Sequence, residues 1–109
     1  MNKNLPSSPQ PIACNVAELN AEQRQRQQAL LSEVRSCVQE IVELTDGYAL
    51  RLPAQNSMIQ MAAEFIALER LCCPFFKFEL EAEPDKGPLW LKLTGRQNVK
   101  KFLRAELGV

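Results

Sequence analysis

Two adjacent cysteines and a nearby glutamate are the densest group of reactive side chains in this sequence. Glu69 stands three residues before Cys72 and four before Cys73. A helix through this segment would therefore place the carboxyl group and both thiols on one side. Thiolate sulfur is the ligand preferred by soft ions such as Zn(II), Cu(I) and Hg(II). The spacing thus indicates Glu69, Cys72 and Cys73 as candidate ligands of a soft metal ion.

Cys14, far upstream, is a candidate further ligand for the same ion. The chain has no histidine, so it lacks both the commonest metal ligand and the usual general base at neutral pH. A site of three thiolates, or of thiolates and a carboxylate, needs no imidazole. The predicted cofactor is a soft metal ion, Zn or Hg, and the predicted role is metal handling or sensing in the cytoplasm.

Two other interpretations of the cysteines stay open. In the first, the protein is a thiol redox or transfer enzyme that uses Cys72 or Cys73 as the nucleophile. The expected position at a helix C-terminus argues against this, because the negative end of the helix dipole disfavours a thiolate. A strained vicinal disulfide between the two is conceivable and would suit a sensor. In the second, the cysteines only pack in the core of a non-catalytic homodimeric module. Cys37, on an apolar helix face, is best explained by packing alone.

Composition narrows the class of protein. With 109 residues, 46% of them hydrophobic and 24% charged, the chain has the size and composition of one globular domain. The 13 basic and 13 acidic side chains cancel, so no nucleic-acid or membrane partner is expected. No segment has the apolar length of a membrane span or a signal sequence. These features predict a cytoplasmic protein, where thiols stay reduced.

The pattern of apolar residues predicts a single α+β domain. Residues 1–13 form a proline-rich, flexible lead, and residues 14–109 form the domain. Helices are expected at about 21–36, 57–72 and from 96 to 107. The first should begin with a capping box from Asn20 to Gln23, and the second with another from Ser57 to Gln60. Strands are expected at about 38–44, 48–52, 75–83 and 89–94.

The order of these elements contains a degenerate repeat. Strand, turn, strand and helix occur from about residue 38 to 71 and again from about 75 to 107. Two ββα units side by side would give a four-stranded antiparallel sheet with helices on one face, plus the N-terminal helix. A sheet face that carries Tyr48 or Trp90 could then support a homodimer.

The segment 65–78 also carries a family resemblance. It resembles a small group of uncharacterised bacterial proteins that share a Glu-Arg-x-Cys-Cys-Pro-Phe motif. Segment 11–14 is similar to that group's Ile-Ala-Cys segment, and segments 46–48 and 93–95 also fit, so the resemblance spans nearly all of the chain after the lead. It implies no defined activity, but it implies a loose association with heavy-metal resistance. It also implies that the following residues belong together, without Cys37: Cys14, Glu69, Cys72 and Cys73.

Overall fold

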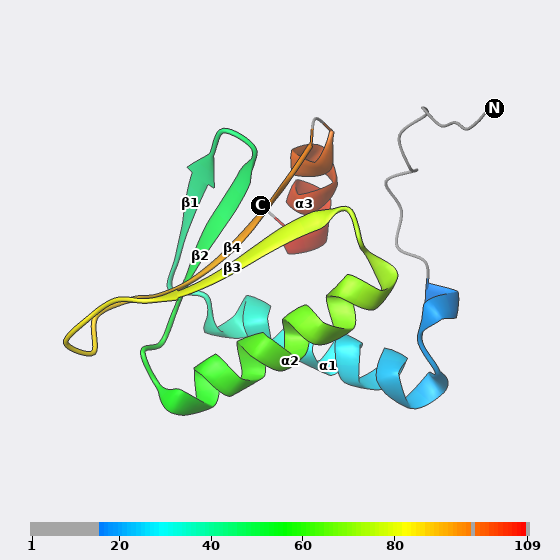
Figure 1. Ribbon diagram of the computed structural model, residues 1–109, viewed down its shortest axis with the longest axis horizontal. Coiled ribbons are helices and arrows are strands. Elements are labelled where there is room, and N and C mark those ends of the chain that lie inside the picture. The colour runs from blue at the N-terminus through cyan, green and yellow to red at the C-terminus, as the bar shows by residue number, and fades with distance from the viewer. Residues whose placement is uncertain (1–15, 97, 109) are drawn as a thin grey trace.

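The computed structural model describes residues 16–96 and 98–108 (Figure 1). Its elements, in chain order, are a short 3-10 helix η1 (Val16–Glu18), α1 (Ala21–Cys37), β1 (Glu40–Leu44), β2 (Gly47–Leu52), α2 (Asn56–Cys72), β3 (Phe76–Ala82), β4 (Leu89–Gly95) and α3 (Val99–Leu107). The predicted α+β architecture of two ββα units preceded by a helix is therefore confirmed. The predicted lead, residues 1–13, lies outside the described residues.

The four strands form one antiparallel sheet in the order β1-β2-β4-β3. Each hairpin pairs its own strands, and β2 joins β4 at the centre, where Leu50 lies opposite Leu91. The helices lie on one face of this sheet (Figure 1). Helix α3 contacts the central strands β2 and β4, whereas α2 contacts β3 and packs against α1.

Local signals explain most of the helix ends. At the start of α1, the Asn20 side chain accepts a hydrogen bond from Gln23 N and the Gln23 side chain accepts one from Asn20 N, which is the predicted capping box. The second predicted capping box is wrong. Helix α2 begins at Asn56, one residue before Ser57, and its cap Gln55 makes no side-chain cap hydrogen bond. Pro74 stands just after the end of α2, where the extended preference before a proline stops the helix.

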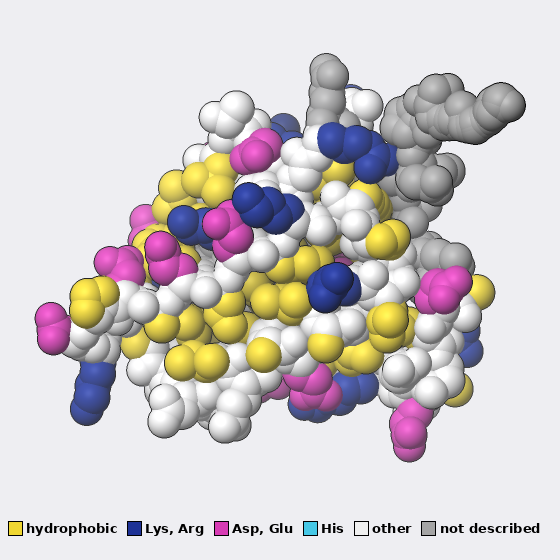
Figure 2. Space-filling model, in the orientation of Figure 1, with side chains coloured by type: hydrophobic (Ala, Val, Ile, Leu, Met, Phe, Trp, Pro, Cys, Tyr) yellow, Lys and Arg dark blue, Asp and Glu magenta, His cyan; other side chains and the backbone are white. Residues whose placement is uncertain are grey.

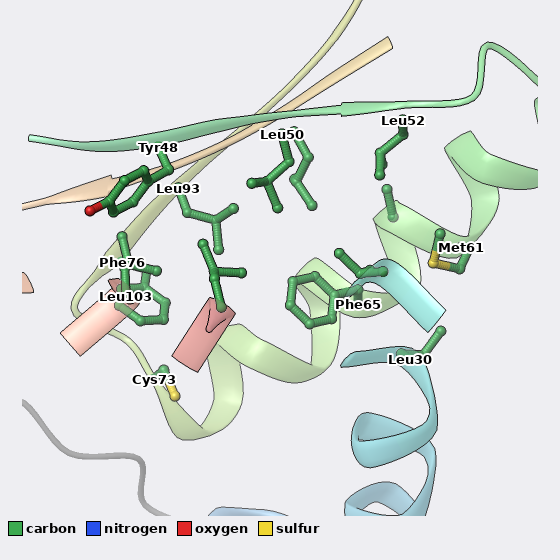
Figure 3. Packing of buried hydrophobic residues seen from close by; sticks show 14 of the residues in the cluster. Leu30, Tyr48, Leu50, Leu52, Met61, Phe65, Cys73, Phe76, Leu93 and Leu103 are labelled. Atoms are coloured by element: carbon green, nitrogen blue, oxygen red, sulfur yellow. The ribbon is translucent and has the colours of Figure 1, made fainter. Parts of the chain in front are cut away.

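The core lies between the sheet and the helices (Figure 3). Phe65 of α2, 1% exposed, lies at its centre. Strands β2 and β4 supply alternate residues to it, as expected for a sheet buried on one face. The strand residues that point toward the helices are Tyr48, Leu50, Leu52, Leu89, Leu91 and Leu93.

The other face of the sheet is mixed in character. Trp90 lies there, half-buried, and its indole Nε1 donates a hydrogen bond to Glu83 Oε2 at 2.9 Å. Tyr48 does not share this face: it is 5% exposed and packs toward α3, where Lys100 lies 5.7 Å from its ring centroid. A register in which Tyr48 opposes Leu93 turns it inward. The expected homodimer thus stays a prediction, with Trp90 alone as its aromatic contact on that face.

Within the described ranges, no helix is long and apolar enough to cross a membrane. Charged and apolar side chains alternate over the face shown in Figure 2, where apolar side chains gather over α2 and β3. Among the residues that the structure describes, Ile59 of α2, 37% exposed, is one of four large apolar residues with appreciable exposure. The other three are Ile41, Val42 and Leu71.

Candidate functional site

An exposed ion pair joins helices α1 and α2 at their surface. Arg26 of α1 donates from Nε to Glu64 Oε2 at 2.8 Å and from its terminal nitrogen to Glu64 Oε1 at 2.7 Å. A two-bond contact between guanidinium and carboxylate restricts both distance and orientation. The next residue along α1, Gln27, reaches the C-terminal half of α2, where it contacts Glu69 and Cys72.

Gln27 connects the two kinds of predicted site residue. Its side-chain amide nitrogen lies 2.6 Å from Glu69 Oε2 and 2.8 Å from Cys72 Sγ. A primary amide has two N–H donors, so one nitrogen can serve both acceptors. Glu69 and Cys72 of α2 therefore both contact the side-chain amide nitrogen of Gln27, which is a donor from α1.

Glu69 is a buried carboxyl group with few polar neighbours. It is 3% exposed. Burial raises the pKa of Glu69 to about 7, the Gln27 hydrogen bond opposes that rise, and the nearby charge of Glu106 adds to it. A carboxyl group of this kind is close to half-protonated at neutral pH. It can therefore donate or accept a proton near neutral pH.

The two adjacent sulfurs lie side by side at the end of α2. Cys72 Sγ and Cys73 Sγ are 3.4 Å apart, and both residues are 0% exposed. Burial raises the pKa of the Cys72 thiol, Gln27 lowers it in part, and the charge of Glu69 raises it further. The environment thus keeps Cys72 protonated, which is the opposite of what an activated nucleophile requires.

The oxidation states of the two sulfurs differ. Cys72 is a free thiol, as is the half-buried Cys37. Cys73 is in a disulfide. The conceivable vicinal disulfide is therefore not formed, because Cys72 remains free beside an oxidised neighbour.

The structure brings together three of the four predicted site residues. Glu69, Cys72 and Cys73 lie at the C-terminal end of α2, whereas Cys14 lies outside the described residues. Arg70 is exposed and Leu71 is 45% exposed, so both point away from the site. In the described part of the chain, no group of three or more His, Cys, Asp or Glu residues is placed to hold a metal ion.

Gln27 is the site residue that the sequence analysis missed. The first half of α1 reads as uniformly polar, which suggested a solvated helix end. Gln27 nevertheless stands three residues before Leu30 and seven before Val34, both 0% exposed. It therefore lies on the buried stripe of α1. This spacing was the available signal, and it is the same kind of signal that singled out Glu69.

The comparisons with known proteins add no relative. No family model, no curated protein and no solved structure matches this chain. The resemblance to the Glu-Arg-x-Cys-Cys-Pro-Phe group stays a prediction, and the function must be argued from the site itself.

Proposed function

We propose that this protein binds a soft, thiophilic ion through Cys72 and Cys73, in metal handling or sensing rather than catalysis. One observation carries the proposal: two buried sulfurs lie 3.4 Å apart with a buried carboxyl group beside them. Two sulfurs this close can bind one ion between them. Soft ions select thiolate ligands, and such a site needs no imidazole.

The chemistry of the neighbours supports binding over simple packing. Cysteine alone packs well in an apolar core. A buried carboxyl group does not, because its burial costs several kcal/mol when it is ionised. Glu69 and Gln27 together give the sulfurs a polar side within an otherwise apolar environment. A thiophilic ion would displace the thiol protons, so the raised pKa of Cys72 does not prevent binding.

Cys14 is our proposed third thiol. The chain contains four cysteines, of which Cys37 and Cys72 are free and Cys73 is in a disulfide. Reduction of the Cys73 disulfide would release its sulfur as a thiol next to Cys72. The reduced protein is therefore the form that we propose to bind the ion, with Cys14 as a further ligand.

A second candidate function rests on the same disulfide. A free thiol 3.4 Å from an oxidised sulfur is in contact with the atom that thiol–disulfide exchange would attack. The Cys72 thiolate would form a bond to Cys73 Sγ while the bond from Cys73 to its partner breaks. The partner leaves as a thiolate and takes up a proton, with no net oxidation. The raised pKa of Cys72 slows this reaction, so we rank it second.

Native mass spectrometry of the reduced protein tests the binding proposal. The protein is loaded with Hg(II) or Zn(II) in the presence of excess glutathione, which competes for any single thiol. We expect wild type and Cys37→Ser to retain one Hg(II) ion each, because Cys37 is remote from the site and serves as the matched control. The double variant Cys72→Ser/Cys73→Ser should not retain the Hg(II) ion.

Two outcomes would decide against binding. Equal retention by wild type and the double serine variant would exclude these sulfurs as ligands. Retention by neither would exclude a chelating site. A separate measurement addresses the second candidate: alkylation of Cys72 no faster than that of free cysteine argues against an enzyme with an activated thiol. A Cys14→Ser variant that binds less tightly would place Cys14 among the ligands.

A further inference from the structure

Strand β3 lies at an edge of the sheet. In the strand order β1-β2-β4-β3, it pairs with β4 on one side, and no strand within residues 16–96 and 98–108 pairs with it on the other. Its side chains are accessible as well: Lys77 and Glu79 are exposed, and Phe78 is only half-buried. An edge strand carries a row of backbone groups that can pair with another strand. The edge of β3 can therefore accept a further strand.

The backbone of Phe78 faces this edge. In an antiparallel pair, residues that exchange two hydrogen bonds alternate with residues that exchange none. Glu83 N donates to Pro88 O at 3.1 Å, and this pair continues the register of β3 with β4. The odd-numbered residues of β3 are therefore the ones that bond to β4. The residues whose N–H and C=O groups point away from β4 are Phe76, Phe78, Leu80 and Ala82.

A second copy of β3 fits this edge in one antiparallel register. A twofold axis at Phe78 places this residue opposite itself, in a pair that can exchange two backbone hydrogen bonds, and places Phe76 opposite the partner's Leu80. On the other face, Lys77 then lies opposite the partner's Glu79, twice by symmetry. Aromatic pairs and opposite charges directly across two strands stabilise pairing. An axis at Lys77 or at Glu79 would instead place two like charges opposite each other, which is destabilising.

The other edge strand, β1, lacks this complementarity. Its charged residues are Glu40 and Glu43, both acidic. No register of two β1 strands can therefore bring opposite charges together. Glu43 also already forms an ion pair with Lys100 of α3. The distribution of charge thus favours β3 as the edge that pairs with a second copy.

We infer that two copies of this chain pair through β3, with a twofold axis at Phe78, so that their two sheets join into one continuous sheet. The interface is isologous, because the same edge serves in both copies. Apolar side chains gather over α2 and β3 (Figure 2), and the half-buried Phe78 and Leu80 would be covered by the partner. The inference is independent of the proposed ion binding. It also differs from a homodimer through the sheet face that carries Trp90, because it uses a strand edge.

Exchange of the charges at Lys77 and Glu79 tests the pairing. Sedimentation equilibrium of wild type, with and without reductant, should give twice the 12.3 kDa mass of one chain. Lys77→Glu and Glu79→Lys should each be monomeric at the same concentration, because each places like charges across the axis twice. The double variant Lys77→Glu/Glu79→Lys should recover the dimer, and a mixture of the two single variants should form a heterodimer. Glu40→Lys on β1 is the matched control and should stay dimeric.

Amide hydrogen exchange, followed by NMR, locates the interface. The amides of Phe78 and Leu80 should exchange slowly in the wild-type dimer and fast in the Glu79→Lys monomer. The amide of Lys77, whose backbone faces β4, should exchange slowly in both, and circular dichroism checks that every variant is folded.

Four outcomes would overturn the inference. The first is a wild type that is monomeric, or dimeric only without reductant, since a disulfide would then hold the two chains. The second is a dimer in which the amides of Phe78 and Leu80 exchange fast, because the interface then lies elsewhere. The third is a dimer that persists in both single variants. The last is a monomer with slow exchange at Phe78, which would show that another segment of the same chain pairs with β3.

Discussion

The amide of Gln27 lies 2.6 Å from the carboxyl group of Glu69, although the two residues are 42 positions apart in the chain. This contact joins α1 to the one buried carboxyl group on α2. The contact allows the Glu69 carboxyl group to be buried, because a buried acceptor that receives a hydrogen bond costs far less free energy than a buried acceptor that receives none. The stability of the domain should therefore depend on the protonation state of Glu69.

Stability should fall as the pH rises from about 4.5 to 7. The pKa of Glu69 is about 7 in the folded protein, against an ordinary value of 4.5. The unfolded chain therefore loses this proton first, and between the two values deprotonation favours unfolding. The loss should approach about 3 kcal/mol and level off above pH 7. Urea unfolding of the reduced protein across this range measures it, and Glu69→Gln should abolish this part of the pH dependence.

Gln27→Ala should destabilise the folded protein most at high pH. The variant leaves the Glu69 carboxylate without this donor, at a cost of about 1–3 kcal/mol. Because the Gln27 hydrogen bond lowers the pKa of Glu69, its removal should shift the upper end of the pH dependence to higher pH. The control is Gln28→Ala, at an exposed neighbouring position. Equal losses for the two variants would contradict a role for Gln27 in holding Glu69.

The ion pair between Arg26 and Glu64 should contribute little to stability despite its good geometry. Both side chains are about half exposed, at 51% and 42%. Exposed pairs of this kind typically contribute about 0.2–1 kcal/mol. A double-mutant cycle with Arg26→Ala and Glu64→Ala should give a coupling energy in that range, and it should shrink in high salt. A coupling energy of several kcal/mol would show that the pair has a larger part in positioning α1.

Phe65→Ala should be among the most damaging single substitutions in this domain. The ring is 1% exposed at the centre of the core, between the sheet and α1. Its removal should cost about 3–5 kcal/mol, because a cavity remains where the ring was. Phe75→Ala, at a half-buried ring that contacts Phe76 with centroids 4.6 Å apart, is the control and should cost less. Thermal or urea unfolding of both variants gives the comparison.

Gly47→Ala should disrupt the pairing of β2 with β4 where β2 begins. A Cβ at Gly47 would lie 2.0 Å from Leu93 O and 2.8 Å from Thr94 Cα. Both neighbours are backbone atoms of β4, so neither can move away cheaply, and we expect a loss of at least about 1–3 kcal/mol. Thr45→Ala, at an exposed position in the same turn, should be close to neutral. A stable Gly47→Ala protein would indicate that β2 and β4 separate at this end more easily than their pairing suggests.

Much of the architecture could be predicted from local patterns. The alternation in β2 and β4 reports directly which face of each strand is buried, and the repeat of two hairpins with helices follows from it. Helix α1 begins at the predicted capping box of Asn20 and Gln23. The start of α2 could not be predicted in this way, because Gln55 caps it without a side-chain hydrogen bond and the Ser57–Gln60 pattern was a false signal.

The candidate site was predictable in part. The positions of Glu69, Cys72 and Cys73 on one helix follow from helical geometry and are visible in the sequence. The inward orientation of Tyr48 could also have been predicted, because Tyr48, Leu50 and Leu52 alternate along β2 and so share its buried face.

The sequence by itself determined that a carboxyl group and two adjacent thiols share one end of α2, because residues three and four apart in a helix share a face. Only the tertiary structure decided what meets them. The approach of Gln27 depends on the packing of α1 against α2, and the high pKa of Glu69 depends on how completely that packing excludes water. Contacts between distant segments and the local dielectric are properties of the folded chain, so no local pattern of residues could have specified them.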